Sequence, residues 1–464
     1  MYFNFLSKKL YVGTAMTAMV IASTMSATAQ NKQTINLPII QTKYTADPAP
    51  YVHGDTVYLY TTHDEDDSEG FKMKDWLLYT STDMVNWQDH GAVASLKDFK
   101  WYKGDNGAWA EQVIERNGKW YMYCPIHGHG IGVLVADSPY GPFIDPLGKP
   151  LVWRSEHWYD IDPTVWIDDD GQAYMYWGNP HTYCVKLNED MISTSGEIMT
   201  MDSIEDYQEG PWFWSRRNAK GEKWYYLAFA STCCPEGIGY AMSKSPTGPW
   251  EHKGHIMDHT PQTRGNHPGI IEFKGKSYCF GLNYDIFRLE SSRHAERRSV
   301  SAAEMTYNAD GTIQELPYFL DAKLNQVGTF DPFRRVEAET MAWGYGLKTT
   351  RQNPSGPWNP TLFVTDIDEG EYIMIKGVDM GQGASLFTAS VSANLYGGSI
   401  EVRLDDVDGP LAGTIDVPYT KFKYEEFSTK LENARGVHDL YLVFKGTKQQ
   451  KRNLFNFDWW QMEK

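Results

Sequence analysis

The stretch Asn117-Gly118-Lys119-Trp120-Tyr121-Met122-Tyr123 decides the fold, because four other parts of the chain repeat its pattern of a glycine turn followed by an aromatic strand. The other copies are His53-Gly54-Asp55-Thr56-Val57-Tyr58-Leu59-Tyr60, Asp170-Gly171-Gln172-Ala173-Tyr174-Met175-Tyr176, Lys220-Gly221-Glu222-Lys223-Trp224-Tyr225-Tyr226 and Lys274-Gly275-Lys276-Ser277-Tyr278-Cys279-Phe280. From Tyr58 onward, a marker tyrosine recurs after 63, 53, 51 and 53 residues. A period of roughly 50 residues with several short strands per unit is typical of a β-propeller. The five copies therefore predict a five-bladed β-propeller over residues 36–320.

The C-terminal part of the chain follows a different pattern. From Arg335 to Lys464, short strands of alternating apolar and polar residues recur between turn residues, as in 399–404 and 439–444. Such a run predicts a β-sandwich of the jelly-roll kind. The whole chain is thus predicted to be all-β, with a sandwich module at 335–464 behind the propeller.

Composition excludes several classes of protein. The chain has 464 residues, of which 41% are hydrophobic and 22% charged, and this balance excludes a disordered or fibrous protein. The 60 acidic residues exceed the 43 basic ones, which gives a net charge of −17 and argues against partners such as nucleic acid or anionic membranes. Aromatic residues make up 14%, which suits β-strands and also supplies flat faces for stacking on sugars.

The N-terminus resembles an export signal. Lys8 and Lys9 precede an apolar stretch at 10–25, and Ala27-Thr28-Ala29 forms a small-residue cleavage site. We therefore expect residues 1–29 to be a signal peptide. The mature protein is expected to be soluble, outside the cytoplasm in the periplasm or medium, and free of the membrane.

An ionisable residue stands just before the first strand of each predicted blade. These residues occur in Asp47-Pro48, Glu111-Gln112, Asp162-Pro163, Glu209-Gly210 and His267-Pro268. One Asp-Pro alone would indicate only a turn, but five such positions in register converge on the axis of a propeller. Carboxylates forced together repel one another and shift their pKa values, so a functional reason is favoured. Converging carboxylates in an aromatic-rich exported protein best suit glycoside hydrolysis, in which one acid protonates the leaving oxygen and one base activates water.

At these positions the chain resembles glycoside hydrolase family 43, whose members are inverting enzymes built on five-bladed propellers. Asp47, in Ala46-Asp47-Pro48, matches the general base of the family. Asp162, in Ile161-Asp162-Pro163, matches the aspartate that orients the acid and raises its pKa, and Glu209, in Glu209-Gly210-Pro211, matches the general acid. An inverting outcome predicts roughly 6.5–9.5 Å between the carboxyl groups of acid and base.

The resemblance extends to residues around these three. His267 resembles an axial histidine that helps to hold a calcium ion in the channel, with a hydrogen-bonded core histidine as the alternative. Trp109 and Glu111 are expected to contact substrate, although Trp109-Ala110-Glu111-Gln112 departs from the usual Trp-Ala-Pro-Asp of the family. Arg298 is also predicted to bind substrate at the mouth, and surface charge is its alternative role.

Residues 335–464 resemble carbohydrate-binding module family 6. The likeness rests on Val336-Glu337-Ala338-Glu339, on Gly436-Val437-His438-Asp439 and on Leu454-Phe455-Asn456-Phe457-Asp458-Trp459. It implies a structural calcium held by Glu337, Glu339 and Asp458, and a sugar contact from Asn456. The aromatic clamp of the family is replaced by Asp366, Phe422 and Tyr424, which leaves open a mainly structural role for the module.

Together these features predict an exported inverting enzyme that releases α-L-arabinofuranosyl units from plant polysaccharide such as arabinoxylan or arabinan. Calcium is the one expected cofactor, and no organic cofactor is expected. Within the same scaffold the alternatives are a β-xylosidase and an endo-arabinanase. The alternatives that are not enzymes are a non-catalytic carbohydrate-binding protein and a purely structural propeller.

Overall fold

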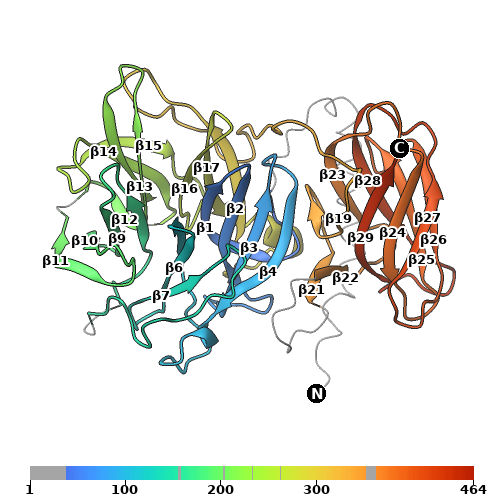
Figure 1. Ribbon diagram of the computed structural model, residues 1–464, viewed down its shortest axis with the longest axis horizontal. Coiled ribbons are helices and arrows are strands. Elements are labelled where there is room, and N and C mark those ends of the chain that lie inside the picture. The colour runs from blue at the N-terminus through green and yellow to red at the C-terminus, as the bar shows by residue number, and fades with distance from the viewer. Residues whose placement is uncertain (1–37, 155–157, 202–203, 233, 262, 352–361) are drawn as a thin grey trace. The chain divides into compact units, whose positions relative to one another are not determined.

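Five antiparallel sheets follow one another along the first two thirds of the chain. The computed structural model describes residues 38–154, 158–201, 204–232, 234–261, 263–351 and 362–464. The first two sheets are β1 (Tyr44–His53), β2 (Thr56–Asp64), β3 (Asp75–Ser81) and β4 (Trp87–Ser95), then β5 (Gln112–Arg116), β6 (Lys119–Pro125) and β7 (Ile131–Ala136). The next two are β8 (Thr164–Ile167), β9 (Ala173–Trp177), β10 (Tyr183–Leu187) and β11 (Thr194–Thr200), then β12 (Tyr207–Arg217), β13 (Lys223–Ser231), β14 (Gly237–Ser243) and β15 (Glu251–Met257). The fifth is β16 (Gly269–Phe273), β17 (Lys276–Asn283) and β18 (Ser299–Met305), and the prediction of a five-bladed propeller is confirmed (Figure 1).

The repeated glycine turns are the hairpins between the first and second strands of each blade. In the second blade Arg116 faces Lys119 across a loop made only of Asn117 and Gly118, whose φ angles are 55° and 77°. These angles are those of a type I′ hairpin, which has positive φ at both loop positions and which Asn-Gly adopts readily. The local sequence therefore sets the register of the aromatic strand that follows.

The aromatic residues of these strands form the interior of the propeller. Tyr60, Tyr123, Tyr176 and Tyr226 are all fully buried. The ring of Tyr176 stacks on Phe213 of the next blade with centroids 4.3 Å apart. Burying a large side chain contributes roughly 2–3 kcal/mol, so the contacts between blades are a main source of stability.

The ring of blades is closed by the segment that leads into β1. The backbone N–H groups of Ile39 and Thr45 donate to the carbonyl oxygens of Val300 and Arg298, at 2.9 and 3.0 Å. These bonds join the start of the described chain to β18 of the fifth blade. As a result the start of β1 lies beside Arg298.

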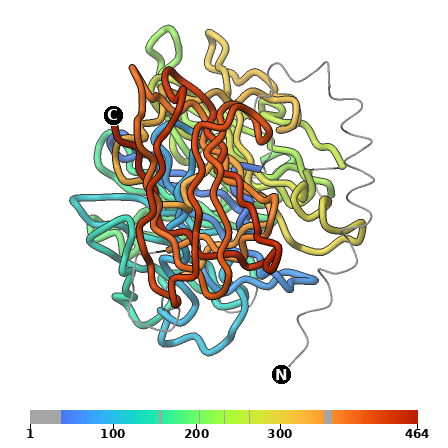
Figure 2. Tube along the Cα trace, turned by 90° about the vertical axis from the view of Figure 1, so that its right-hand side faces the viewer, coloured from blue at the N-terminus to red at the C-terminus, as the bar shows by residue number. Residues whose placement is uncertain are grey.

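The C-terminal region is the predicted β-sandwich (Figure 2). One sheet contains β21 (Lys348–Arg351), β22 (Leu362–Thr365), β29 (Asn456–Glu463), β24 (Leu386–Ser392) and β27 (Glu425–Lys430), with β19 (Val336–Glu337) paired to β29. The other contains β23 (Tyr372–Asp379), β28 (Val437–Lys445), β25 (Gly398–Leu404) and β26 (Leu411–Val417). Phe387, Leu442 and Trp460 are fully buried in a core built from both sheets.

One strand from the C-terminal region joins the propeller, which the sequence did not indicate. Strand β20 (Thr340–Met341) pairs with β4, so that Thr340 faces Gln88 and Met341 faces Trp87. Nearby, the buried carboxylate of Asp89 accepts hydrogen bonds from Lys43 and Thr349, at 3.0 and 2.5 Å. Residues 36–464 form one compact unit, while the domain limits predicted from sequence remain predictions.

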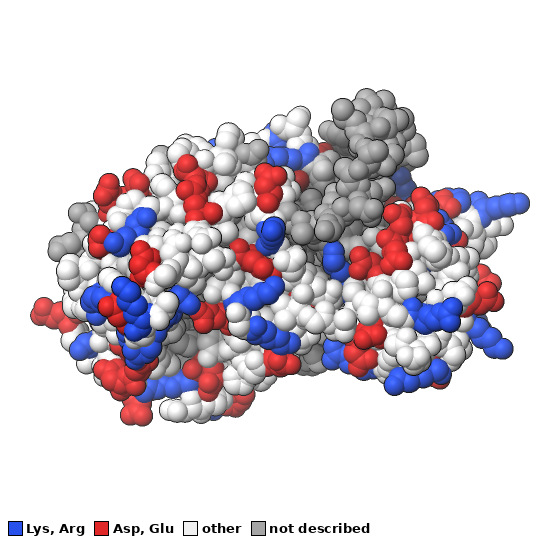
Figure 3. Space-filling view, turned by 90° about the horizontal axis from the view of Figure 1, so that it is seen from above, with Lys and Arg blue, Asp and Glu red and all other residues white. Residues whose placement is uncertain are grey.

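The surface and the remaining short elements add little to the site. The first and fifth blades also carry a 3₁₀ turn, Leu96–Asp98, and the short helix α2 (Asp285–Glu290). Within the described ranges, helices long and apolar enough for a membrane crossing are absent, and the predicted signal peptide 1–29 lies outside those ranges. Figure 3 shows acidic and basic side chains interspersed over one face.

Candidate active site

The three predicted carboxylates stand at irregular points of the strands that lie nearest the axis. The pairing of β1 with β2 shifts between Ala46 and Ala49, which brackets Asp47, and the pairing of β12 with β13 shifts on both sides of Glu209. Asp162 lies two residues before the start of β8. Bulges of this kind redirect side chains and are frequent beside active sites.

The backbone at two of these positions is strained. Asp47 and Asp162 have φ angles of 51° and 56°, in the left-handed region that residues with a Cβ rarely adopt. Such conformations cost about 1–3 kcal/mol each and persist where the surrounding structure imposes them. The fold therefore gives up stability to direct these two carboxyl groups.

His267 lies between the three carboxylates, and the structure brings all four side chains together. Its Nδ1 is 3.6 Å from Asp47 Oδ1, and its Nε2 is 3.5 Å from Glu209 Oε1 and 4.0 Å from Asp162 Oδ2. Asp47 and Glu209 thus face opposite nitrogens of one imidazole ring. The distance between the oxygens of Asp47 and Glu209 is therefore at most the sum of these two contacts and the width of the ring, about 9.5 Å. This limit equals the upper end of the separation between acid and base in inverting glycosidases.

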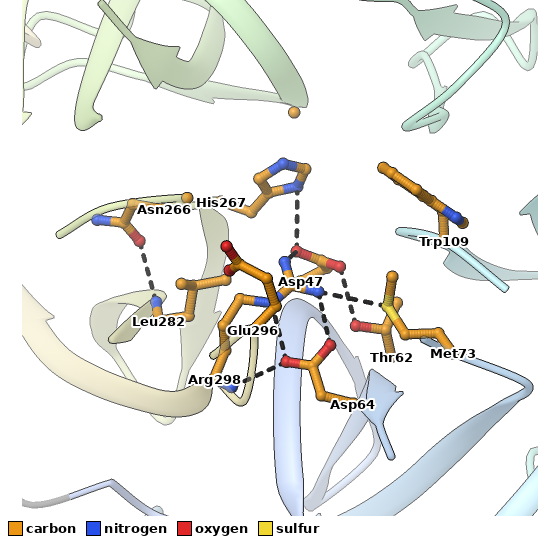
Figure 4. A network of polar contacts seen from close by, with 12 residues as sticks. Asp47, Thr62, Asp64, Met73, Trp109, Asn266, His267, Leu282, Glu296 and Arg298 are labelled. Carbon is orange, nitrogen blue, oxygen red and sulfur yellow. Dashed lines mark hydrogen bonds and ion pairs between the residues drawn. The ribbon is translucent and has the colours of Figure 1, made fainter. Parts of the chain in front are cut away.

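Asp47 is held by neighbours on both of its oxygens. Thr62 donates to Oδ2 at 2.8 Å and Arg298 Nη1 donates to Oδ1 at 2.9 Å (Figure 4). Arg298 is only 4% exposed, so it is no surface charge, and its remaining donors bind the fully buried Asp64. Burial disfavours the guanidinium charge, but Asp47 and Asp64 outweigh that effect and hold the pKa of Arg298 well above its usual value.

Asp162 and His267 have shifted pKa values with opposite consequences for charge. Burial raises the pKa of Asp162 to about 8, and the charges of Glu209 and Asp47 add to the rise while His267 opposes it. Burial works against the positive charge of His267, but Asp47 and Asp162 outweigh it and raise the pKa of His267 to about 10. Burial thus favours the neutral form of Asp162, and the surrounding carboxylates favour the charged form of His267.

Glu209 is the most accessible of the three acids. Its side chain is 21% exposed, against 4% for Asp47 and 3% for Asp162. The side-chain amide of Asn179 donates to Glu209 Oε2. A proton donor has to reach the oxygen of the leaving group, and of the three carboxyl groups only Glu209 has a side chain open enough to do so.

Glu111 lies deeper than the sequence suggested. It is 4% exposed and lines a cavity of about 20 Å³ together with Asp47, Asp162 and His267. Neither carboxyl oxygen of Glu111 has a hydrogen-bond partner among the described residues. Burial and the charge of Asp47 raise its pKa well above the usual value. Its predicted contact with substrate stays a prediction.

A row of aromatic rings leads outward from the three acids. Trp109 stacks on His127 with centroids 4.5 Å apart, and Phe71 and Trp158 extend the row at 5.4 Å from Trp109 and 6.1 Å from His127. Phe71 is 43% and Trp158 41% exposed. The guanidinium of Arg298 lies 5.2 Å from the ring of Phe71, which connects the row to the group that holds Asp47.

Two clusters in the described part of the chain have the spacing of metal ligands. One is Asp162, Glu209 and His267, and the other is His63, Glu65 and Asp75, whose ligand atoms lie within 4.8 Å of one another. His63 and Glu65 already pair with Asp75 and Lys74, so the second cluster is a set of ion pairs.

The residues predicted to bind calcium in the C-terminal module do not form such a cluster. Glu337 pairs with Arg335 at 2.8 Å, and Arg335 lies 4.0 Å from Asp458. Glu339 is buried, and its Oε2 has no partner among the described residues. The predicted sugar ligand Asn456 accepts a hydrogen bond from Thr365 at 2.9 Å.

Three residues of the site were not predicted from the sequence: Thr62, Asp64 and Asn179. Thr62 and Asp64 lie at the end of the aromatic strand β2, and Asn179 lies two residues beyond the end of β9. Polar residues at the end of a marker strand were the sequence signal that could have identified them. The second strand of a blade ends on the same side of the propeller as the start of the first strand, where the predicted acids lie.

Comparison with known proteins gives two family matches. The model of the family described as "Glycosyl hydrolases family 43" matches residues 35–313, and that of "Carbohydrate binding module (family 6)" matches 337–464. The chain is 33% identical to "Arabinoxylan arabinofuranohydrolase" of Bacillus subtilis (strain 168), over 91% of each protein. It is 35% identical to the protein of that name from Paenibacillus polymyxa, over 91% of this chain and 74% of the relative.

Solved structures give the same result. A family 43 arabinoxylan arabinofuranohydrolase from Bacillus subtilis, crystallised with cellotetraose, has a TM-score of 0.81 and 32% identity over 92% of this chain and 97% of the other. A β-xylosidase/α-arabinofuranosidase from a compost metagenome, in a calcium-free form, has a TM-score of 0.52 and 26% identity over 61% of this chain and 97% of the other. Because a family model matches more than half of its length, this chain belongs to glycosyl hydrolases family 43, and it carries a family 6 carbohydrate binding module.

Proposed function

We propose that this protein removes α-L-arabinofuranosyl units from arabinoxylan by hydrolysis with inversion. The observation that carries the proposal is the placement of Asp47 and Glu209 at opposite nitrogens of His267, at 3.6 and 3.5 Å. This placement allows a separation of up to about 9.5 Å, and an inverting enzyme needs roughly 6.5–9.5 Å between its acid and base to leave room for the attacking water.

In this mechanism Asp47 is the general base and Glu209 the general acid. Glu209 gives its proton to the glycosidic oxygen as the C–O bond to the arabinofuranosyl unit breaks, while Asp47 takes a proton from the attacking water. Arg298 and Thr62 fix both oxygens of Asp47, so the base has one orientation towards that water. Asp162 accepts a hydrogen bond from the backbone of Gly210 at 3.2 Å, which ties it to the segment of the acid.

The preference for arabinoxylan rests on two supports. The relatives that match 91% of this chain bear the name arabinoxylan arabinofuranohydrolase. The exposed row of Phe71, Trp109, His127 and Trp158 offers apolar faces beside the acids, on which the rings of a xylan main chain can stack. An enzyme that acts on side groups of a polymer needs such a surface outside its pocket.

The test is to incubate the pure protein with arabinoxylan, arabinan and xylo-oligosaccharides and to follow the products by NMR. We expect free arabinose from arabinoxylan, released first as the β anomer, because inversion of an α-linkage gives that product. Release of xylose alone would favour a β-xylosidase, and release of arabino-oligosaccharides an endo-arabinanase. A parent protein as inactive as E209A on every glycan, yet still binding them, would identify a non-catalytic carbohydrate-binding protein.

We further propose that calcium binds in the module at Glu337, Glu339 and Asp458, and beside His267 in the propeller channel. The buried and unpartnered Oε2 of Glu339 supports the first site, because hard oxygen ligands suit calcium. The spacing of Asp162, Glu209 and His267 supports the second, where an ion would bind the neutral form of His267 and replace the proton that the carboxylates stabilise in its absence. We expect metal analysis to find calcium that E339Q and H267N each reduce, and a protein purified without any retained calcium would refute both sites.

We also propose that the protein is exported after loss of residues 1–29. The support is the charged, apolar and small-residue pattern of its N-terminus. N-terminal sequencing of the protein recovered from the periplasm or medium should begin at Gln30. Recovery of an uncleaved chain from the cytoplasm would overturn this proposal.

A further inference from the structure

We propose that Asn179 is a positioning residue for the general acid: it holds the carboxyl group of Glu209 in place through a hydrogen bond to Oε2. The inference rests on the role proposed above for Glu209. Asn179 comes from the third blade and Glu209 from the fourth, so the contact spans the junction between two blades.

The orientation of the Asn179 amide follows from its two partners. Its Nδ2 donates to Glu209 Oε2, and its Oδ1 accepts from Gln208 Nε2 at 3.2 Å. Turning the amide over would bring its oxygen against a carboxyl oxygen and its NH₂ against another NH₂. Only one arrangement satisfies both neighbours, so Asn179 presents a donor to the acid.

The backbone beside Asn179 is tied to the segments of two of the three acids. Gly178 N–H donates to the carbonyl of Ile161, the residue before Asp162, at 2.9 Å. The hydroxyl of Tyr207, two residues before Glu209, donates to the carbonyl of Gly178 at 2.6 Å. Asn179 itself is 5% exposed, so the surrounding atoms restrict the rotation of its side chain and keep solvent away from it.

The bond from Asn179 also stabilises the charge that the acid acquires. An amide N–H can only donate, so Glu209 Oε2 accepts its hydrogen bond. The other oxygen, Oε1, lies on the side of the pocket 3.5 Å from His267 Nε2. Once Glu209 has given up its proton to the leaving group, the bond from Asn179 becomes stronger, because bonds to ionised acceptors are stronger.

This role predicts a dependence on the leaving group. A sugar alkoxide leaves only with a proton, whereas a dinitrophenolate leaves well without one, so only the first reaction needs a well-placed acid. We expect N179A to lower kcat/KM on an arabinose-substituted xylo-oligosaccharide by about 10- to 100-fold. We expect less than about a threefold loss on 2,4-dinitrophenyl α-L-arabinofuranoside. Q208A, which removes the support of the amide, should show a smaller effect with the same substrate dependence.

The matched control is N218A. Asn218 is a similarly buried asparagine, 7% exposed, and donates to a glutamate, Glu222, at 2.7 Å in the turn between β12 and β13. Its loss should affect both substrates alike. Equal losses on both substrates in folded N179A, or no loss on either, would overturn the role of Asn179. If N179A does not fold, Q208A replaces it in the test, and equal losses on both substrates or no loss on either would again overturn the role of Asn179.

E209Q separates this inference from the proposed function. We expect E209Q to lose far more activity on the oligosaccharide than on the dinitrophenyl glycoside. If E209Q instead loses both equally, Glu209 is not the acid and the proposed mechanism fails. If activity depends on the leaving group in E209Q but not in N179A and Q208A, the proposed mechanism is retained and the positioning role of Asn179 is refuted.

Discussion

Arg298 joins two buried aspartates: its Nη1 donates to Asp47 Oδ1 and its Nε to Asp64 Oδ2, each at 2.9 Å. A second bond from Nη2 to Asp64 Oδ1 makes the contact with Asp64 bidentate. Asp64 therefore holds the guanidinium of Arg298 in place, and the guanidinium holds the carboxylate of Asp47. We therefore expect Asp64 to influence the chemistry through Arg298.

We predict that D64N lowers both stability and activity. The amide keeps the shape of the side chain but leaves one guanidinium donor buried without its ionised partner, and breaking a buried pair costs about 3–5 kcal/mol. Urea denaturation should show a loss of that order, and kcat should fall at least about tenfold because Asp47 loses its fixed support. D67N is the control, since Asp67 pairs with Lys72 on the exposed surface. A change in D64N as small as in D67N would contradict the prediction.

A second prediction concerns the backbone at Asp162. Its φ of 56° favours glycine, so D162G should be more stable than D162A by about 1 kcal/mol. Both variants lose the carboxyl group and both should be inactive, so the comparison isolates the backbone. Denaturation curves of the two variants test this prediction. If D162A is as stable as D162G or more stable, the backbone strain is absent.

A third prediction is a loss of stability at alkaline pH. The folded state raises the pKa of His267 from 6.5 to about 10 and so binds its proton more tightly than the unfolded chain does. That contribution is complete below the unfolded pKa and is lost as pH rises through the folded pKa. Between pH 6.5 and 10 the free energy of unfolding should fall more steeply for the parent than for H267Q. Parallel curves for the two proteins would refute the imidazolium.

A fourth prediction tests the aromatic row. W158A should lower kcat/KM on arabinoxylan by about tenfold, equivalent to about 1.4 kcal/mol of apolar contact, and leave nitrophenyl arabinofuranoside unaffected. The small substrate fills only the pocket and does not reach Trp158. Y140A is the control, because Tyr140 is similarly exposed, at 44%, and packs against Tyr58 and His90 instead. Equal losses on both substrates in W158A would place Trp158 in the pocket itself.

A fifth prediction concerns the glycine beside the acid. Gly210 has a φ of 60°, and a Cβ there would lie 3.0 Å from the ring of His267. G210A should therefore displace His267 and lower kcat, with a loss of stability of about 1–2 kcal/mol. The control is G221A, at a turn where φ is 79° but no atom lies within 4 Å of the added carbon. G221A should lose similar stability and keep full activity.

The sequence predicts those features that depend on local conformation. Asn117-Gly118 between two strands strongly favours a hairpin, and five glycine turns at a steady spacing define the blades. The positions of Asp47, Asp162 and Glu209 relative to these turns likewise placed them near one axis. Their resemblance to a known family added roles that spacing alone does not give.

The features that escaped prediction depend on contacts between distant segments. Arg298 and Asp47 are 251 positions apart, and they meet only because the leading segment closes the ring against β18. Asn179 reaches Glu209 only across the junction of two blades. No periodicity encodes such pairs, since each arises from the packing of whole sheets.

The pairing of β20 with β4 has a consequence for how such proteins can evolve. An open edge strand invites association with other chains, and β20 covers that edge of the first blade. Recombination that exchanged the C-terminal region for an unrelated binding domain would uncover β4 and favour aggregation. In this chain the appended region therefore protects a strand of the enzyme as well as forming a module of its own.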